Sequence, residues 1–421
     1  MSQGYLDLKY KPQSNDLVCL FYVEPAEGVS LAKAANHVAG ESSIGTWTEV
    51  STMKDDIWGK LRPSIYSLDE ENKLVKIAYP LELFEPENIA QILSSVAGNI
   101  YGMKALENLR LLDVGFPSKM IKKHAGPRFG IQGVRDVVEV RERPLVGTIV
   151  KPKVGLPPRE HANVAYEAWV GGCDVVKDDE NLTSQGFNKF KDRITETLGA
   201  RDKAEGDSGE TKVYMPNVTA ETYEMLERID YVKDHGGRYA MVDVVTLGFS
   251  AVQSVRQKDY GVVLHAHRAM HAALTRNPRH GITMLALAKL LRLVGVDQLH
   301  IGTAVGKMQG PKEEVYSISQ AITQKKVEEK QDRLPQLWGQ VKPVFPVCSG
   351  GLHPGHVPEL MGFMGQDIII QAGGGIHGHP EGTRQGAEAM RAAIEATLEN
   401  QSLHQWGEKH KPLELALRKF K

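Results

Sequence analysis

Four charged residues, Lys177 to Glu180, form the segment Lys-Asp-Asp-Glu directly after the apolar run Gly-Gly-Cys-Asp-Val-Val. Three carboxylates crowded at the end of a strand repel one another unless a cation neutralises them. Side chains alternate along a strand, so Lys177 and Asp179 are expected on one face and Asp178 on the other, with Glu180 swinging back as the chain turns. Oxygen atoms of this segment can then converge on one hard metal ion. A solvated charge cluster is the alternative interpretation.

The elements that must position this segment form a regular series from about residue 145. Eight short apolar or β-branched runs occur at 147–150, 173–176, 213–215, 240–242, 262–265, 299–301, 344–347 and 368–370. Segments with helix-type spacing lie between several of them, at 161–170, 220–232, 282–293 and 384–398. The repeat averages about 32 residues, the length of one strand plus one helix. The pattern predicts an α/β fold with a (β/α)8 TIM barrel and a helical tail after His404.

The first part of the chain lacks this repeat. Strand-like patterns at 16–23 and 75–83 and helix-like patterns at 31–39 and 88–96 indicate a separate α+β domain. We therefore predict an N-terminal α+β domain over residues 1–125 and a catalytic barrel domain over residues 126–421.

Polar and glycine residues cluster where the predicted barrel strands end. The carboxyl ends of barrel strands converge on one mouth, where TIM-barrel enzymes carry their chemistry. Glycines after the last two strands let backbone N–H groups approach an anion closely, and Arg268 and His300 could hold a second anion. Two such sites with a metal between them would suit a small bisphosphate. The strand-end residues are Lys151 and Lys153 after the first run, Lys177 to Glu180 after the second, His265, His267 and Arg268 after the fifth, His300 and Lys307 after the sixth, Ser349, Gly350 and Gly351 after the seventh, and Gly373, Gly374 and Gly375 after the eighth.

Each of these features has an ordinary alternative when it is taken alone. Lys-Pro-Lys is a common surface motif, three glycines are often only a turn, and Lys307 in a glycine loop can be solvated. His265 is expected to be a packed or hydrogen-bonded strand residue, whereas His267 lies two residues nearer the mouth and is the better catalytic candidate. Their occurrence together on six strand ends of one barrel favours the functional interpretation.

Composition limits the partners. The 421 residues carry 51 Lys and Arg against 52 Asp and Glu, so the net charge of -1 gives no general attraction to nucleic acid or an anionic membrane. Three widely spaced cysteines, Cys19, Cys173 and Cys348, predict neither a disulfide framework nor a zinc site. No secretory stretch is recognised, and Lys289 and Arg292 interrupt the apolar stretch 284–296. We expect a soluble, cytoplasmic protein.

The family that the chain resembles is the large subunit of ribulose-1,5-bisphosphate carboxylase/oxygenase (RuBisCO). The barrel segments that carry the resemblance are GTIVKPKVGL (147–156), GGCDVVKDDEN (171–181), HAHRAMH (265–271), HIGTAVGK (300–307), SGGLH (349–353) and GGG (373–375). In the first domain, GESSIGTWT (40–48) and GNIYGMKA (98–105) are similar to the family's N-terminal active-site segments. The resemblance covers nearly the whole chain and is strongest to the archaeal, form III branch.

A metal centre is the first implication of this resemblance. Lys177 resembles the lysine that takes up an activator CO2 as a carbamate, which requires a neutral amine. A mouth crowded with Lys151, Lys153 and Lys307 is expected to favour that neutral form. The carbamate, Asp179 and Glu180 then give an all-oxygen site suited to Mg2+.

Further catalytic roles follow from the same resemblance. The carbamate on Lys177 is the implied base that removes the proton at C3. Lys151 resembles the acid that completes proton transfer at C2, with Lys153 tuning it. His267 resembles a proton carrier to the substrate hydroxyls, and Lys307 resembles the lid lysine that steadies the incoming CO2.

The resemblance also implies a set of substrate contacts and a dimer. Four of the contacts come from the neighbouring subunit in this family, so a homodimer is the smallest complete unit, and a higher homo-oligomer is expected. One phosphate would be held by Thr46, Trp47, Gly373 and Gly374, and the other by Arg268, His300 and Ser349, beside Gly350 and Gly351. Glu41 and Asn99 are similar to residues that pair with the lid lysine and contact the sugar.

The implied activity is that of a carbon-carbon lyase acting on ribulose 1,5-bisphosphate. Addition of CO2 or O2, hydration and cleavage would give two 3-phosphoglycerates in the CO2 reaction. A RuBisCO-like enolase or isomerase acting on another sugar phosphate is the alternative, and a non-enzymatic scaffold is a third. Ile149 and Gln309 depart from the plant-type pattern, which has threonine and glutamate there. AMP breakdown and a Calvin-type cycle both remain open as pathways.

Overall fold

The computed structural model describes residues 4–46, 48, 50–306 and 312–420, and the chain folds into two compact units. The first unit contains the described residues of Met1–Gly126, together with Met270–Gly295 and Gln324–Val341. The second contains the described residues of Pro127–Ala269, Val296–Thr323 and Lys342–Lys421. The domain boundary predicted from the sequence lies between residues 125 and 126. It assigns Met270–Gly295 and Gln324–Val341 to the barrel domain, whereas the structure includes them in the first unit.

A mixed five-stranded sheet organises the first unit, in the order β10-β4-β1-β3-β2. Helix α1 packs against strands β1 and β2 of this sheet. The elements of the unit are β1 (Leu17–Pro25), α1 (Leu31–Glu41), α2 (Asp55–Leu61), β2 (Ser64–Asp69), β3 (Leu74–Tyr79), η1 (Leu81–Leu83), α3 (Ile89–Val96), η2 (Asn99–Gly102), β4 (Leu106–Gly115), α4 (Ser118–Ile121), α11 (His271–Thr275), β10 (Gly281–Ile282), α12 (Met284–Val294), β12 (Lys326–Val327) and β13 (Gln336–Leu337).

Most sequence-based expectations for this unit are confirmed, with one correction. The patterns at 16–23, 31–39 and 88–96 correspond to β1, α1 and α3. The predicted strand 75–83 is too long, because β3 ends at Tyr79 and a short 3-10 helix, η1, follows. Pro80 separates the two, and proline cannot donate a backbone hydrogen bond to a strand ladder.

Helix α12 is buried along its whole length, although it carries two cations. Lys289 Nζ lies 2.8 Å from Asp113 Oδ1, and both side chains are fully buried. The Arg292 guanidinium stacks over the Trp338 ring at 4.5 Å. Pairing of this kind is what permits charge inside a core. No helix in the described part of the chain is long and apolar enough to cross a membrane.

Eight parallel strands form the barrel of the second unit, in the order β7-β6-β5-β15-β14-β11-β9-β8. The ends of this order meet through hydrogen bonds from Val218 N to Met241 O (3.0 Å) and from Met241 N to Pro216 O (2.8 Å), which close the barrel. All eight predicted runs are confirmed as its strands. They are β5 (Leu145–Ile149), β6 (Val175–Lys177), β7 (Val213–Met215), β8 (Tyr239–Asp243), β9 (Val263–His267), β11 (Gln298–His300), β14 (Phe345–Ser349) and β15 (Ile369–Gln371).

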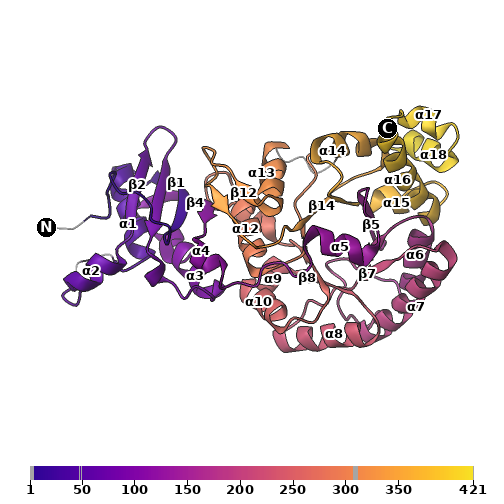
Figure 1. Ribbon diagram of the computed structural model, residues 1–421, viewed down its shortest axis with the longest axis horizontal. Coiled ribbons are helices and arrows are strands. Elements are labelled where there is room, and N and C mark those ends of the chain that lie inside the picture. The colour runs from indigo at the N-terminus through magenta and orange to yellow at the C-terminus, as the bar shows by residue number, and fades with distance from the viewer. Residues whose placement is uncertain (1–3, 47, 49, 307–311, 421) are drawn as a thin grey trace. The chain divides into compact units, whose positions relative to one another are not determined.

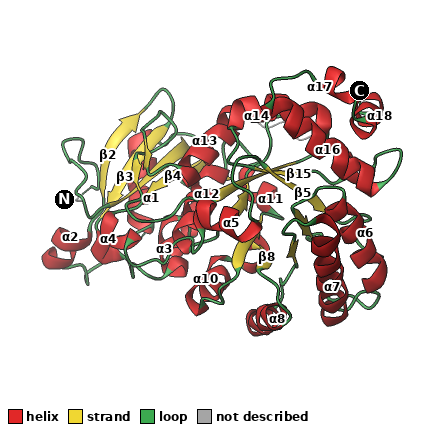
Figure 2. Cartoon of the chain, turned by 45° about the vertical axis from the view of Figure 1, so that its right-hand side comes forward, coloured by secondary structure: helices red, strands yellow, loops and turns green. Residues whose placement is uncertain are grey.

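Helices surround these strands and close one end of the barrel. Figure 1 shows α6, α7 and α8 along the outside of β5 and β7. In Figure 2 the helices are red and the strands that they surround are yellow. Helix α5 packs Val134 and Val138 against inward residues of the strands, so it fills the amino end and leaves the carboxyl end for the site. The helices are α5 (Gly130–Val138), α6 (Pro158–Val170), α7 (Phe190–Ser208), α8 (Thr222–Asp234), α9 (Val244–Leu247), α10 (Phe249–Lys258), α13 (Lys312–Thr323), η3 (Pro354–His356), α14 (Val357–Met364), α15 (Gly374–His377), α16 (Thr383–Leu398), α17 (Leu403–Gly407) and α18 (Lys411–Lys419).

Candidate active site

Lys177 closes β6 inside the barrel and is almost completely buried, with 1% of its surface exposed. Its Nζ lies 2.8 Å from the Asp178 carbonyl oxygen, 3.3 Å from Met241 Sδ and 4.0 Å from Glu180 Oε2. Burial lowers the pKa of the Lys177 amine, and the nearby carboxylates only partly oppose this. The shift is toward the neutral amine, and its main cause is burial, since the charge of Lys151 makes a smaller contribution.

Asp179 and Glu180 point their carboxylates toward the basic residues of the mouth. Lys151 Nζ donates to Asp179 Oδ2 at 2.9 Å, while Glu180 faces Lys153 Nζ at 3.5 Å and His267 Nε2 at 3.7 Å. Burial alone would raise the pKa of both carboxyls. The neighbouring cations outweigh it, chiefly Lys151 for Asp179, so both pKa values are lowered. The two groups are therefore anionic oxygen donors at neutral pH.

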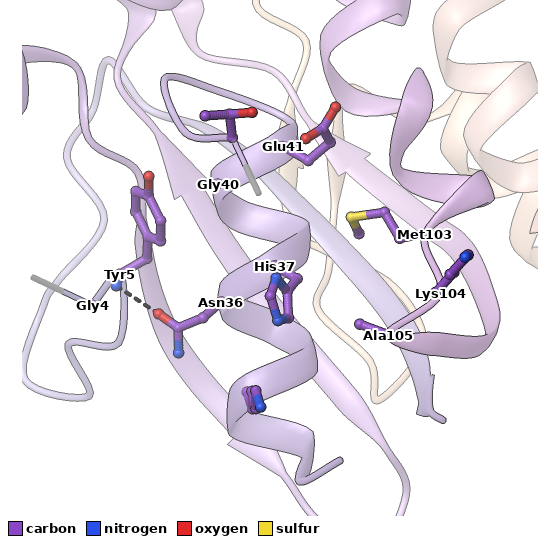
Figure 3. Close-up of a pocket in the computed structure, with 11 residues that line it drawn as sticks. Gly4, Tyr5, Asn36, His37, Gly40, Glu41, Met103, Lys104 and Ala105 are labelled. Carbon is purple, nitrogen blue, oxygen red and sulfur yellow. Dashed lines mark hydrogen bonds between the residues drawn. The ribbon is translucent and has the colours of Figure 1, made fainter. Parts of the chain in front are cut away.

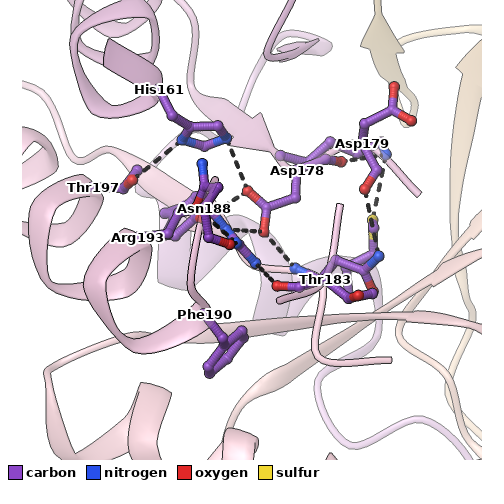
Figure 4. Close-up of polar contacts among 12 residues, drawn as sticks. His161, Asp178, Asp179, Thr183, Asn188, Phe190, Arg193 and Thr197 are labelled. Carbon is purple, nitrogen blue, oxygen red and sulfur yellow. Dashed lines mark hydrogen bonds and ion pairs between the residues drawn. The ribbon is translucent and has the colours of Figure 1, made fainter. Parts of the chain in front are cut away.

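Asp178 is fully buried and, as strand alternation predicts, does not share the surroundings of Asp179. Figure 4 shows its carboxylate turned toward His161 and Arg193. It accepts hydrogen bonds from Arg193 Nε (3.0 Å), Tyr214 OH (2.6 Å) and Asn217 N (2.9 Å), and His161 Nε2 lies 3.1 Å away. Burial would raise its pKa, but Arg193 and these donors lower it well below the usual range. The segment is thereby fastened to α6, α7 and the end of β7.

Two histidines of β9 have different surroundings. His265 is buried and hydrogen-bonded to Gln298 Oε1 (2.7 Å) and His300 Nε2 (3.0 Å), which confirms its expected packing role. Burial lowers the pKa of His265 to about 3. His267 instead reaches the mouth, where its Nδ1 lies 2.8 Å from Asp243 Oδ1. A carboxylate on one ring nitrogen fixes the tautomer and leaves Nε2 for chemistry.

Arg268, His300 and Ser349, predicted to share one anion, lie in the same unit of the fold. His300 Nδ1 is 2.8 Å from Ser349 Oγ, and burial keeps the pKa of His300 well below its usual value. The positive charge of Arg268 contributes to the same lowering. Burial lowers the pKa of Arg268 to about 10, so it remains a cation at neutral pH.

The glycine segments after β14 and β15 pack directly against each other. A side-chain carbon on Gly375 would collide with the carbonyl oxygen of Leu352 and with His353, so only glycine fits there. A carbon on Gly373 would lie 3.1 Å from Lys151 Cε, whereas one on Gly374 would meet open space. The segment Gly373–Gly375 therefore lies beside Lys151, the predicted acid, and also beside open space.

The first unit holds the remaining predicted contacts around α1 and η2. Glu41, the last residue of α1, and Thr46 line a cavity of about 720 Å³, and Asn99 begins η2. Figure 3 shows His37 and Glu41 on α1 facing the turn that carries Lys104. The predicted residues Trp47 and Lys307, together with Gln309, lie outside the described residues.

Sequence reasoning missed two polar residues that close strands. Asp243 at the end of β8 holds His267, and Asn217 just after β7 donates through Nδ2 to the Glu180 carbonyl oxygen at 3.1 Å. Both stand at strand-closing positions of the predicted barrel, which was the available signal. Neither lies in a motif with recognisable spacing.

The chain is similar to known proteins over both of its parts. The family model described as ribulose bisphosphate carboxylase large chain, catalytic domain, matches residues 130–420, and the N-terminal domain model matches 4–120. The ribulose bisphosphate carboxylase of Methanocaldococcus jannaschii is 56% identical, covering 99% of this chain and all of the relative. That of Pyrococcus horikoshii is 47% identical over 98% of this chain and 94% of its own length.

Solved structures give the same result. A dimeric archaeal RuBisCO from Hyperthermus butylicus is similar at a TM-score of 0.94 and 44% identity, covering 99% of this chain and 98% of that one. An octameric RuBisCO from P. horikoshii, in complex with sulfate ion, has a TM-score of 0.92 and 46% identity over 99% and 96%. The predicted resemblance to archaeal enzymes is confirmed, and the chain belongs to the ribulose bisphosphate carboxylase large-chain family.

Proposed function

We propose that this chain is a ribulose-1,5-bisphosphate carboxylase/oxygenase that joins CO2, or O2, to its substrate, and with CO2 yields two molecules of 3-phosphoglycerate. Full-length similarity to proteins named ribulose bisphosphate carboxylase, with 56% identity to one of them, is the observation that carries the proposal. The cluster of Lys177, Asp179 and Glu180 at a barrel mouth supports it chemically.

Mg2+ fits the donors at this mouth, provided that Lys177 is modified. Within the described residues, no group of three His, Cys, Asp or Glu side chains could hold a metal ion. Asp179 and Glu180 supply two carboxylates, and a carbamate on Lys177 would supply the third oxygen ligand. Burial shifts Lys177 toward its neutral amine, which is the form that reacts with CO2. When bound, Mg2+ would polarise the substrate carbonyl and its neighbouring hydroxyl, which lowers the cost of removing the C3 proton.

Proton movement is assigned to residues that already touch these carboxylates. The carbamate on Lys177 is the proposed base at C3, and Lys151, bonded to Asp179, is the proposed acid at C2. Lys153 lies beside Glu180 and tunes the charge of the mouth. His267, oriented by Asp243, would carry protons to and from the substrate hydroxyls.

The two phosphates are assigned to opposite sides of the mouth. The backbone of Gly373 and Gly374, with Thr46 and Trp47, would bind one phosphate, because N–H groups on a glycine segment can approach an anion closely. Arg268, His300 and Ser349 would bind the other, next to Gly350 and Gly351. A bidentate guanidinium is well suited to phosphate.

A homodimer is the proposed minimal active unit. Glu41, Thr46, Trp47 and Asn99 are proposed to complete the site of a neighbouring subunit, with Glu41 and Asn99 beside Lys307. Two solved relatives are described as dimeric and octameric, which supports assembly of this kind. Nucleic acid and membrane partners are not part of the proposal.

Three free, buried cysteines support a reducing, cytoplasmic location. For the pathway, AMP or nucleoside breakdown supplying ribulose bisphosphate is favoured by the form III resemblance, with a Calvin-type cycle as the alternative.

The test is fixation of radiolabelled CO2 into acid-stable product with ribulose 1,5-bisphosphate and Mg2+ supplied. Label in 3-phosphoglycerate is the expected result. Proton exchange at C3 without label would instead support the RuBisCO-like enolase or isomerase. Lys307→Ala sharpens the test, because loss of the lid lysine should stop label incorporation while sparing C3 exchange.

A further inference from the structure

A chain of three hydrogen bonds lies behind the glycine segment Gly373–Gly375. Thr383 Oγ1 is 3.0 Å from His377 Nδ1, and His377 Nε2 is 3.0 Å from Thr148 Oγ1. Thr148 Oγ1 in turn donates to the carbonyl oxygen of Ala372 at 2.7 Å. The chain thus connects α16, α15 and β5 to the residue that precedes the segment.

The direction of every bond in this chain is fixed. The single hydroxyl hydrogen of Thr148 goes to Ala372, so His377 Nε2 must be the donor to Thr148 Oγ1. His377 Nδ1 is then an acceptor, and the Thr383 hydroxyl donates to it. Burial lowers the pKa of His377 to about 4. A backbone hydrogen bond with Ile149 opposes this lowering, and the charge of Lys151 adds to it. One neutral tautomer therefore persists at neutral pH.

Because peptides are planar, fixing the Ala372 carbonyl also fixes the orientation of the Gly373 N–H. The Ala372 carbonyl and the Gly373 N–H belong to one planar trans peptide and point in opposite directions. Holding the carbonyl on Thr148 therefore turns the Gly373 N–H away from Thr148. Gly373 also borders Lys151, and Gly374 borders open space, so the segment has a free side on which an anion can lie.

We propose that Thr148 and His377 are positioning residues that hold the Gly373 N–H in the orientation required to donate to a phosphate of the substrate. Neither residue would touch the substrate. The proposal rests on the proposed function, because the ligand is a phosphate of the sugar bisphosphate. A purely structural role is already filled by the Ala372 N to Gly147 O bond (2.9 Å), which holds β15 to β5.

The test separates substrate binding from turnover and from folding. Thr148→Val keeps the shape and removes the hydroxyl, so KM for ribulose 1,5-bisphosphate should rise about fivefold, with kcat changed less than twofold. His377→Leu should raise KM by a similar factor. The double variant should resemble either single variant, because both break one chain. Thr148→Ser retains the hydroxyl and should restore KM to within about twofold of the parent.

A matched control is Thr397→Val, since Thr397 Oγ1 also donates to a backbone carbonyl, that of Ala393 at 2.7 Å, inside α16. Its KM should equal the parent value. An unchanged KM in folded Thr148→Val and His377→Leu, or failure of Thr148→Ser to restore binding, would overturn the proposal. If the parent chain fixes no CO2, the proposed function fails by itself. Calorimetric titration with inorganic phosphate then decides: weaker binding by Thr148→Val supports the positioning role, and equal binding refutes it.

Discussion

Two adjacent carboxylates, Asp178 and Asp179, have opposite surroundings. Asp178 is held by donors from three other parts of the barrel, Arg193, Tyr214 and the backbone of Asn217. Asp179 is held by Lys151, whose side chain is 27% exposed, and by its own loop. A carboxylate with rigid, buried donors contributes to folding, whereas one held by a movable lysine can exchange that partner for a ligand. One strand end therefore combines an anchor and a reactive face.

Replacing Lys177 should have the largest effect. Lys177→Met keeps the apolar stem and removes the amine, so turnover should fall more than about a thousandfold and Mg2+ affinity should fall with it, because a ligand and the proposed base are lost together. Turnover and calorimetric Mg2+ titration in bicarbonate measure this. Lys212→Met is the matched control, since Lys212 is equally buried but bonds Glu210 and the Cys173 carbonyl. Turnover persisting in Lys177→Met would contradict the carbamate role.

Neutralising Asp179, the carboxylate on the reactive face, should have the second-largest effect on turnover. Asp179→Asn should lower turnover at least a hundredfold, while the free energy of unfolding should fall less than in Asp178→Asn, because the partner Lys151 is partly exposed and can turn to solvent. Chemical denaturation and turnover on the same samples provide the comparison. A large loss of stability would show that Asp179 is an anchor as well.

Neutralising the anchor should give the reverse pattern. Asp178→Asn leaves Arg193 buried without its counter-charge, so stability should fall by about 3 kcal/mol. Turnover of the folded fraction should fall less than about tenfold. If turnover collapsed without loss of stability, the distinction between the two carboxylates would be wrong.

The orienting carboxylate of His267 should matter less. Asp243→Asn replaces the carboxylate at 2.8 Å from Nδ1 with a neutral amide that can also donate, so the ring loses its fixed tautomer, and turnover should drop about tenfold. Steady-state kinetics measure the drop. Asp207→Asn, which makes the same change at the exposed acceptor of the Tyr166 hydroxyl, should leave turnover unchanged. An equal effect of both changes would argue against a specific role for Asp243.

Activation by CO2 should depend on pH in a direction set by burial. Acid protonates the Lys177 amine and removes the reactive form, so the activation rate should rise with pH, with a midpoint below 10.5, the usual lysine pKa. Glu180→Gln removes a carboxylate that opposes this lowering, so its midpoint should move further down. Activation rates at constant dissolved CO2 test both statements. A midpoint at or above 10.5 would contradict them.

The sequence predicted the barrel well, because each buried strand is a short β-branched run and its closing residues are polar. Strand alternation placed Asp179 on the same face as Lys177, and the turn of the chain was expected to bring Glu180 back to that face. The partners of Asp178 could not be predicted, because His161, Arg193 and Tyr214 come from separate elements that meet only after folding. The burial of Lys177 also becomes visible only after folding. The prediction therefore attributed the lowered pKa of Lys177 to nearby lysines, whereas burial is the larger cause.

The end of strand β3 and the hydrogen-bonded chain behind Gly373 were not predicted, for different reasons. The run 75–83 read as one strand because its apolar residues continue past Pro80, although the strand ends at Tyr79. The Thr148–His377–Thr383 chain has no sequence signature, since its members lie 229 and 6 residues apart. Hydrogen-bonded supports of this kind become visible only in three dimensions.

The most direct test of the account is detection of the modified lysine itself. The protein is incubated with 13C-labelled CO2 and Mg2+, and its carbamate carbon is observed by NMR. The account predicts a carbamate signal in the parent chain and in Lys212→Met that is lost in Lys177→Met. A signal that survives in Lys177→Met, or no signal in a parent chain that fixes CO2, would contradict it.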